Sequence, residues 1–409
     1  MKNNLDKRRW MILIAACLIN LCIGSLYAWS VFAMPMASYL SEVTGKEITS
    51  LSIVFTVANG VGPITMIAGG AITKKIGPRK VILLGGLLFA SGMITSGFVR
   101  SVGLLIVTYG LLVGLGVGMV YGCTISNTIR FFPDKRGLIG GIATASYGIS
   151  SVLIPIVANL LIRHVGVTFS FKIIGAVMLL VIVIASVFIE NCPDGYTPAG
   201  YVGKTGRKLQ IREYSWNEML KEPLFYLMLL TLCCGATSGM MIISQASPLA
   251  QRVLNITAGT AASIVSMIAL FNTIGRIIAG GISDRLGPIV TIRFIFVGSL
   301  AGLALMYVAI SGGAGICFYI GAYITALMFG SIMGIYPGFT ASQFGPNNNG
   351  VNFGIMFIGF ALAGLIGPTL LSELYISTGC DTLALLLAMG LAAAGLLLAF
   401  ALGKLKKVP

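Results

Sequence analysis

The chain has 409 residues, of which 57% are hydrophobic and 10% are charged, and Lys and Arg outnumber Asp and Glu by 27 to 12. A composition this apolar excludes a soluble globular domain and indicates a protein that crosses a membrane many times. The net charge of +15 would suit a nucleic-acid-binding protein, but most of the basic residues lie in the short segments between apolar runs. They therefore indicate membrane topology, and we expect no nucleic-acid partner.

Twelve apolar runs follow one another along the chain, separated by short polar or charged turns. A helix of about 20 residues spans the ~30 Å hydrocarbon core of a bilayer. The runs lie near residues 10–34, 50–73, 81–99, 103–131, 138–162, 169–189, 223–247, 259–282, 289–311, 315–342, 351–376 and 382–403. The first is too long for the core of a signal peptide and lacks a small-residue cleavage site, so we keep it as a spanning helix. The sequence predicts an all-α membrane protein with twelve transmembrane helices.

The basic residues are distributed unevenly between the two sides that these helices would create. If the amino terminus is cytoplasmic, 21 Lys and Arg residues fall on that side, 5 fall on the opposite side and one lies inside a span. An excess of Lys and Arg is typical of cytoplasmic loops. We therefore expect a multi-pass protein of the cell (inner, cytoplasmic) membrane with both termini in the cytoplasm.

Two segments that follow apolar runs match each other at an offset of 210 residues. The first reads Gly70-Ala-Ile-Thr-Lys74-Lys75-Ile-Gly77-Pro78 and the second reads Gly280-Gly-Ile-Ser-Asp284-Arg285-Leu-Gly287-Pro288. A further set, Gly137, Gly141 and Pro155, matches Gly350, Gly354 and Pro368 at an offset of 213. An internal repeat of this kind predicts two pseudo-symmetric six-helix bundles of the same topology. We assign residues 1–189 and 223–409 to the bundles and residues 190–222 to a cytoplasmic linker.

An arginine lies inside the eighth apolar run, where a charge is costly. Arg276 precedes the charged turn at Asp284 by eight residues. That is about 12 Å of helix, against ~15 Å for half of the hydrocarbon core, so Arg276 lies near the midplane. Asn272 lies one helical turn away on the same face. Charged residues at this depth are rare and mark candidate functional sites.

No acidic residue is available inside another span to neutralise Arg276, because all twelve Asp and Glu residues fall at termini, in loops or at helix ends. Two interpretations remain: helix carbonyls satisfy the guanidinium group, or a substrate anion binds to it. A guanidinium group matches a carboxylate in bidentate geometry, and the Asn272 amide can donate a hydrogen bond to a neighbouring oxygen. We favour a carboxylate-binding site at Arg276 and Asn272.

Other residues within the spans are candidates for lining the same site. They are Tyr27, Trp29, Tyr121, Tyr147, Gln245 and Tyr336. Each of them can equally serve helix packing or anchoring at the membrane surface. Phe357 and Phe360 occupy the eleventh span, which has no Lys or Arg between Val351 and Ser372. A single buried cation favours a monoanion with a small apolar body.

The repeated loop resembles the signature found between helices 2 and 3 and helices 8 and 9 of the major facilitator superfamily. Its residues are Gly70, Gly77 and Arg79 in the first copy and Gly280, Asp284, Arg285 and Gly287 in the second. The resemblance implies the major facilitator fold and a role of these loops in conformational change. The first copy has Lys74 where the family usually has an acid, so a conformational lock that depends on an acid would fall to Asp284.

A narrower resemblance begins in the first span. The segments Gly24-Ser-Leu-Tyr27-Ala-Trp29-Ser-Val-Phe32, Phe131-Phe-Pro-Asp-Lys-Arg136-Gly137 and Asn352-Phe353-Gly354 are similar to the oxalate/formate antiporter family and related monocarboxylate transporters. The resemblance implies that Asn272, followed after three residues by Arg276, holds the substrate carboxylate. Oxalate exchangers of that family place a lysine in helix 11, which this sequence lacks.

We predict an alternating-access transporter of small monocarboxylate anions such as pyruvate, lactate or formate, working by anion exchange or by proton symport. The alternatives are an oxalate/formate-type dicarboxylate antiporter and a non-transporting membrane sensor of carboxylates. Apart from the bilayer and the anion, we expect no partner and a monomer. The eight cysteines follow no metal-ligand spacing and no buried catalytic constellation is evident, so we expect no metal, no cofactor and no enzymatic activity.

Overall fold

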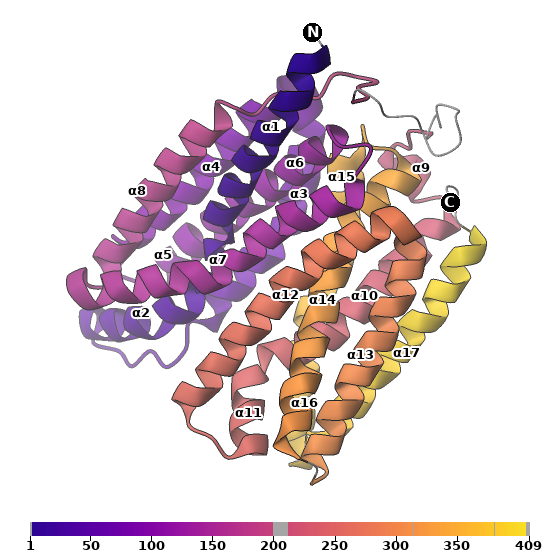
Figure 1. The fold of residues 1–409 in the computed structure, drawn as a ribbon. Helices are drawn as coiled ribbons and strands as arrows, with labels where there is room; N and C mark the ends of the chain where they lie inside the picture. Colours follow the sequence, from indigo (N-terminus) through magenta and orange to yellow (C-terminus); the bar gives the residue numbers. More distant parts are fainter. Residues whose placement is uncertain (1, 199–211, 313, 380, 406–409) are drawn as a thin grey trace. The chain divides into compact units, whose positions relative to one another are not determined.

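The computed structural model describes residues 2–198, 212–312, 314–379 and 381–405. Nearly all of them are helical (Figure 1), and twelve helical segments are long and apolar enough to cross a membrane. The predicted all-α fold with twelve spans is thereby confirmed. The cytoplasmic position of both termini stays a prediction, and residues 199–211 of the predicted linker lie outside the described residues.

The first six spans are built from ten helical elements, several of which share one span. They are α1 (Lys2–Ile23), η1 (Gly24–Ala28), α2 (Trp29–Thr44), α3 (Ser52–Ile76), α4 (Pro78–Ser96), α5 (Val102–Leu105), η2 (Ile106–Val113), α6 (Gly114–Arg130), α7 (Arg136–Val165) and α8 (Val167–Ser186).

A four-residue helix, α9 (Trp216–Met219), precedes the second group of six spans. The elements of that group are α10 (Pro223–Ser244), α11 (Ala246–Leu254), α12 (Ala258–Leu286), α13 (Pro288–Ile310), α14 (Gly315–Phe344), α15 (Asn349–Met356), α16 (Ile358–Thr378) and α17 (Thr382–Leu405).

Four of the spans that the sequence predicts as continuous helices are interrupted. The first changes to a 3₁₀ helix at Gly24–Ala28 and the fourth to a π helix at Ile106–Val113, while turns at Gln245 and Phe357 divide the seventh and eleventh. At the first interruption a methyl group on Gly24 would overlap the Tyr147 carbonyl, so this backbone is surrounded by protein. Irregular backbone at membrane depth is tolerated in such surroundings.

Glycine followed by proline ends the helix that precedes each copy of the repeated loop. Gly77 and Gly287 have φ values of 83° and 86°, and Pro78 and Pro288 begin the next helices. Glycine adopts positive φ without a steric penalty, and proline is well suited to the first turn of a helix. The two copies of the loop therefore share one backbone conformation, as the offset of 210 residues predicts.

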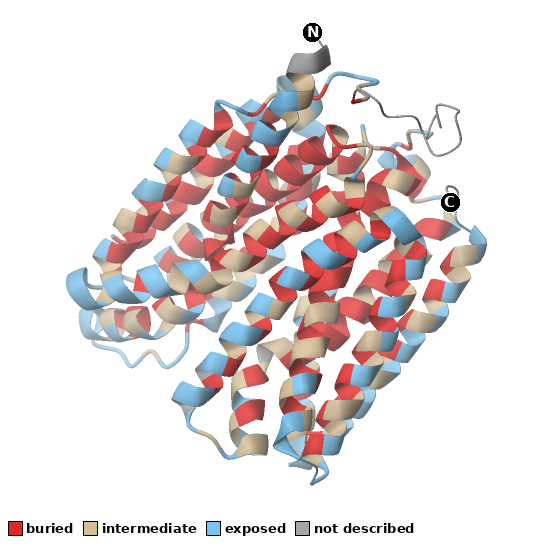
Figure 2. Ribbon diagram, in the orientation of Figure 1, coloured by how far each residue is buried: buried red, intermediate tan, exposed pale blue. Residues whose placement is uncertain are grey.

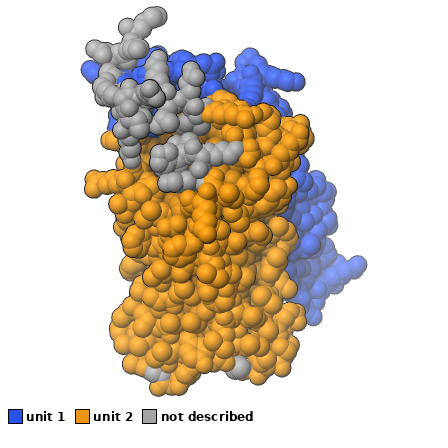
Figure 3. All heavy atoms as spheres, turned by 90° about the vertical axis from the view of Figure 1, so that its right-hand side faces the viewer, with its two compact units in different colours: residues 1–133, 146–209, 346–355 blue, residues 134–145, 210–345, 356–409 orange. Residues whose placement is uncertain are grey.

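The contacts between residues divide the chain into two compact units, which Figure 3 shows in different colours. Unit 1 comprises residues 1–133, 146–209 and 346–355, and unit 2 comprises residues 134–145, 210–345 and 356–409. Two of the boundaries between the units fall within α7 and at the end of α15. The division by sequence repeat into residues 1–189, 190–222 and 223–409 stays a prediction.

Exposed residues lie along the faces of many helices (Figure 2). Many of them are large and apolar, and Met34, Ile376 and Leu397 are among the most exposed. Such a surface suits contact with hydrocarbon. The interior of unit 1 contains stacked aromatic rings, with centroids 4.2 Å apart for Phe32 and Phe171. In unit 2, Gly235 and Gly395 pack directly against the ring of Phe296.

A candidate anion-binding site around Arg276

Arg276 is buried in α12, with 6% of its surface exposed. Its Nε and Nη2 atoms donate to Asn272 Oδ1 at 3.2 and 3.1 Å, as the spacing of one helical turn permits. Its Nη1 atom donates to the main-chain carbonyl of Thr144 in α7 at 2.8 Å. Asn272 is itself buried, and its Nδ2 atom lies 3.5 Å from the Ala326 carbonyl. The two sequence-predicted residues therefore form one hydrogen-bonded pair.

Glycines on two neighbouring helices bring the backbone of α12 into close contact. A methyl group on Gly330 of α14 would overlap the Asn272 carbonyl, and one on Gly334 would overlap the Arg276 carbonyl. On α7, a methyl group on Gly141 would also overlap the Arg276 carbonyl. Small residues at helix interfaces let backbones approach in this way. Residues far apart in the chain thus determine where the guanidinium group lies.

Within the described part of the chain, the acceptors that bind the Arg276 guanidinium group are neutral: the side-chain oxygen of Asn272 and the Thr144 carbonyl. Ion pairs there join Arg8 with Glu190, Arg130 with Asp194, Arg212 with Glu218 and Arg252 with Asp381. Arg276 takes part in none of them. The carbonyl acceptor considered in the alternative interpretation is present at Thr144, whereas a carboxylate partner is not.

Three of the predicted lining tyrosines lie together in unit 1. The ring centroid of Tyr147 is 5.4 Å from that of Tyr27 and 4.9 Å from that of Tyr121. Tyr27 lies in η1, where the helix is irregular. Trp29 packs separately, 4.5 Å from the ring of Tyr109. These rings form one cluster of phenols and one packed pair.

The predicted lining residues of unit 2 are dispersed. Tyr336 is buried and its hydroxyl donates to the Met228 carbonyl at 2.8 Å, and its role in lining the site stays a prediction. Phe357 and Phe360 lie 4.7 Å apart at the start of α16. Gln245 is half-buried at the turn between α10 and α11. Of the hydrogen bonds of Arg276 described above, none involves these side chains.

Asp284, in the second copy of the loop, binds the beginning of α7. Its two carboxylate oxygens accept hydrogen bonds from the main-chain N–H groups of Gly137 and Leu138 at 2.7 and 2.8 Å. The positive end of the helix dipole favours a carboxylate at this position. Gly280 packs so closely on Gly137 that a methyl group on either would overlap the other's backbone. Arg285, the neighbour of Asp284, is exposed.

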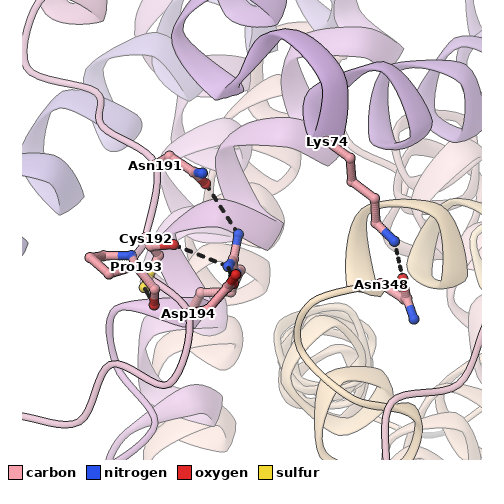
Figure 4. Close-up of polar contacts among 7 residues, drawn as sticks. Lys74, Asn191, Cys192, Pro193, Asp194 and Asn348 are labelled. Atoms are coloured by element: carbon pink, nitrogen blue, oxygen red, sulfur yellow. Dashed lines mark hydrogen bonds and ion pairs between the residues drawn. The ribbon is translucent and has the colours of Figure 1, made fainter.

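The first copy of the loop approaches α15 in the same way but carries the opposite charge. Gly70 packs against Gly350, and the Lys74 ammonium group donates to Asn348 Oδ1 (Figure 4). Arg79, the remaining residue of the predicted motif, is exposed. Lys74 departs from the motif, and it therefore places a cation beside the start of α15 where Asp284 places an anion beside the start of α7.

Unit 1 contains a cavity of about 320 Å³ beside Lys74, which the sequence does not predict. Arg130 lies at its wall and donates to Asn191 Oδ1, the Cys192 carbonyl and Asp194 Oδ1 at 3.2, 3.1 and 3.0 Å, the three acceptors visible in Figure 4. Burial raises the pKa of the Cys192 thiol to about 11. From the sequence alone, Arg130 is only one of the 21 basic residues assigned to the cytoplasmic side, because its acceptors lie more than 60 residues away in the chain.

Comparison with known proteins gives consistent results for both sequence and fold. The family model described as Major Facilitator Superfamily matches residues 7–368. The oxalate:formate antiporter of Oxalobacter formigenes is 28% identical over 93% of this chain and 88% of its own length. An uncharacterized transporter of this type from Escherichia coli, YhjX, is 26% identical over 89% and 87%. Human monocarboxylate transporter 12 is 24% identical over 92% and 77%.

Among solved structures, the proton:xylose symporter XylE has a TM-score of 0.76 at 15% identity, covering 98% of this chain and 96% of the symporter. At that identity the likeness concerns the fold alone. The family model spans most of the chain, and the twelve apolar helical spans and the repeated loop agree with it. The chain belongs to the Major Facilitator Superfamily of membrane transporters.

Proposed function

We propose that this transporter carries small monocarboxylate anions and that Arg276 binds their carboxylate group. One observation supports this proposal above all others. Arg276 is buried among neutral acceptors and forms no ion pair within the described residues. A buried cation without an anionic partner is costly. A carboxylate that enters the site would supply the missing negative charge.

The hydrogen bonds of Arg276 leave two of its N–H groups unused. A guanidinium group has five N–H donors, and three of them are used by Asn272 and Thr144. One N–H on Nη1 and one on Nη2 remain, which is enough for a two-point contact with a single carboxylate. In this proposal Asn272 holds the guanidinium plane in a fixed orientation, which reduces the conformational entropy lost on binding.

The number of cations favours a monoanion. The eleventh span has no Lys or Arg between Val351 and Ser372, where Phe357 and Phe360 lie. Two relatives are named for carboxylates, one as an oxalate:formate antiporter and one as a monocarboxylate transporter. Both names agree with a carboxylate substrate, and the first keeps oxalate as the alternative.

Uptake by proteoliposomes tests the proposal directly. The purified chain is reconstituted, and the uptake of labelled pyruvate, lactate, formate and oxalate is measured for the wild type and for Arg276→Gln and Arg276→Lys. We expect uptake of one or more monoanions, loss of uptake in Arg276→Gln and partial uptake in Arg276→Lys, which keeps the charge without the planar fork. Arg293→Gln is a matched control, because Arg293 also donates to a backbone carbonyl, that of Ala399.

Undiminished transport by Arg276→Gln would contradict the proposal, and uptake of oxalate alone would favour the dicarboxylate alternative. Binding of monocarboxylates without any uptake would favour a sensor. Preloading the vesicles with unlabelled anion distinguishes exchange from proton symport, because exchange is stimulated by the internal anion and symport by an inward proton gradient.

A further inference from the structure

The cavity beside Lys74, here called the Lys74 cavity, has polar walls and lies away from Arg276 in the chain. Its lining residues come from α3, α6, α15 and the segments at residues 191–194 and 346–347. They include Lys74, Ser126, Asn127, Arg130 and Gly350. All of them belong to unit 1. The cavity volume of about 320 Å³ is large enough for a small ion with several bound water molecules.

Two cations line this cavity, and only one of them has a carboxylate partner. Arg130 pairs with Asp194, whose side chain is 89% exposed. Lys74 donates to the neutral amide oxygen of Asn348 (Figure 4). Within the described residues, Lys74 takes part in no ion pair. The local balance of these three charged groups is therefore positive.

Two buried polar side chains at the cavity wall lack hydrogen-bond partners for one atom each. Ser126 is 7% exposed and its Oγ atom has no partner; Asn127 is 4% exposed and its Oδ1 atom has none. The Asn127 Nδ2 atom donates to the Glu190 carbonyl at 2.9 Å, which fixes Oδ1 as the acceptor. Unpartnered buried polar groups are costly and uncommon in native structures. This pair offers a hydroxyl donor and an amide acceptor to a ligand.

The equivalent place in unit 2 is filled by a side-chain anion. There Gly280 packs on Gly137, and Asp284 accepts hydrogen bonds from the first N–H groups of α7. In unit 1, Gly70 packs on Gly350 at the start of α15, but the residue that corresponds to Asp284 is Lys74. A helix N-terminus attracts an anion, and here the loop supplies a cation.

We propose that the Lys74 cavity binds a small oxyanion that carries an O–H group, of which hydrogen phosphate is the simplest. Its charged oxygens lie beside Gly350 at the start of α15, where the Val351 N–H, which corresponds to the Leu138 N–H, already donates to the Asn348 carbonyl at 3.1 Å. Lys74 and Arg130 balance the negative charge, Ser126 donates to an oxygen, and the O–H group of the ion donates to Asn127. Binding of the ion stabilises the folded protein, because the cavity that holds the ion exists only in the folded state.

The test measures phosphate binding to the full-length chain in detergent, by calorimetry and by the shift in melting temperature. We expect binding in the millimolar range or tighter, and weaker binding of sulfate, which has no O–H group at neutral pH. Lys74→Gln should weaken phosphate binding by about 10-fold or more, since it removes a charge-assisted hydrogen bond. Ser126→Ala should weaken it by a smaller factor.

Two further variants test whether the effect is specific to Lys74: a control at the neighbouring lysine and a substitution of Lys74 by an acid. Lys75→Gln removes an exposed charge next to Lys74 that does not line the cavity, and it should leave phosphate binding unchanged. Lys74→Asp restores the acid of the second copy, so it should raise the melting temperature without phosphate and abolish the further rise with phosphate. Arg276→Gln should bind phosphate normally, which separates this cavity from the proposed transport site.

Three results would overturn the proposal: no phosphate binding by the wild type in the millimolar range, equal losses in Lys74→Gln and Lys75→Gln, or equal affinity for phosphate and sulfate. The second would indicate attraction by surface charge in general. The third would indicate that Asn127 makes no contact with the ion.

Discussion

The two copies of the glycine-rich loop have the same backbone conformation but opposite charge at one position. In both, a glycine with positive φ ends the helix, and an earlier glycine packs against the start of a distant helix. In the second copy Asp284 accepts the first N–H groups of α7, whereas in the first copy Lys74 turns to the amide of Asn348. The glycines therefore determine how each loop packs on the distant helix. The side chain at position 74 or 284 determines which charge lies beside the start of that helix.

A second difference lies deeper in the same two helices. The offset of 210 residues pairs Arg276 with Met66, which is buried in α3 and packs against Gly122 of α6. One copy therefore has an apolar side chain where the other has a guanidinium group. Both halves of the chain therefore contain the repeated helix and loop, but only the second half has the arginine that is proposed to bind the substrate.

The largest effect on transport is expected when Arg276 is replaced by Met, the residue at the corresponding position 66 of the first copy. Arg276→Met removes the charge and two potential hydrogen bonds to a carboxylate, so monocarboxylate uptake should fall by about 100-fold or more. The variant also removes the donors to Asn272 Oδ1 and to the Thr144 carbonyl, so the melting temperature should fall as well. Uptake by proteoliposomes and the melting temperature check both parts, and a variant that transports normally would contradict the proposed role.

A large effect on stability is expected from a methyl group at the contact of α14 with α12. Gly330→Ala would overlap the Asn272 carbonyl, and overpacking of this kind costs about 1–3 kcal/mol. Gly281→Ala is the matched control, since its methyl group would meet only Leu138 at an ordinary 3.6 Å. Thermal unfolding in detergent should show a lower melting temperature for Gly330→Ala alone. Similar melting temperatures for the two variants would show that α12 can move away.

A smaller effect is expected from the cap of α7. Asp284→Asn keeps the shape and removes the charge, so the two hydrogen bonds to Gly137 and Leu138 weaken by about 1 kcal/mol in total. Asp284→Lys makes the second copy like the first and should destabilise the protein further, through repulsion from the helix dipole. Chemical or thermal unfolding ranks the variants, and an Asp284→Lys protein as stable as wild type would contradict the capping role.

The smallest effect is expected at the neighbouring pair of basic residues, Lys75 and Arg285, which correspond to each other across the repeat. Both are exposed, so Lys75→Gln and Arg285→Gln should each change the free energy of unfolding by less than about 0.5 kcal/mol. Melting temperatures of the two variants measure this. A clear loss in only one of them would show that the two loops differ beyond Lys74 and Asp284.

The sequence predicts those features that depend on periodicity or on repetition. The pairing of Arg276 with Asn272 follows from the spacing of one helical turn, and the match of Gly70 with Gly280 follows from the offset. The break at Gly24–Ala28 was not predicted, because the contact made there, between Gly24 and the Tyr147 carbonyl, involves a distant helix. The acceptors of Arg130 could not be predicted for a similar reason, because they lie in a segment more than 60 residues later in the chain.

The acceptor at Thr144 belongs to the main chain, so a change of side chain at this position leaves it in place. The orientation of Arg276 can therefore persist through evolution while residues around it vary. If Arg276 binds the substrate carboxylate as proposed, neighbouring side chains can change while this hydrogen bond to the guanidinium group is kept.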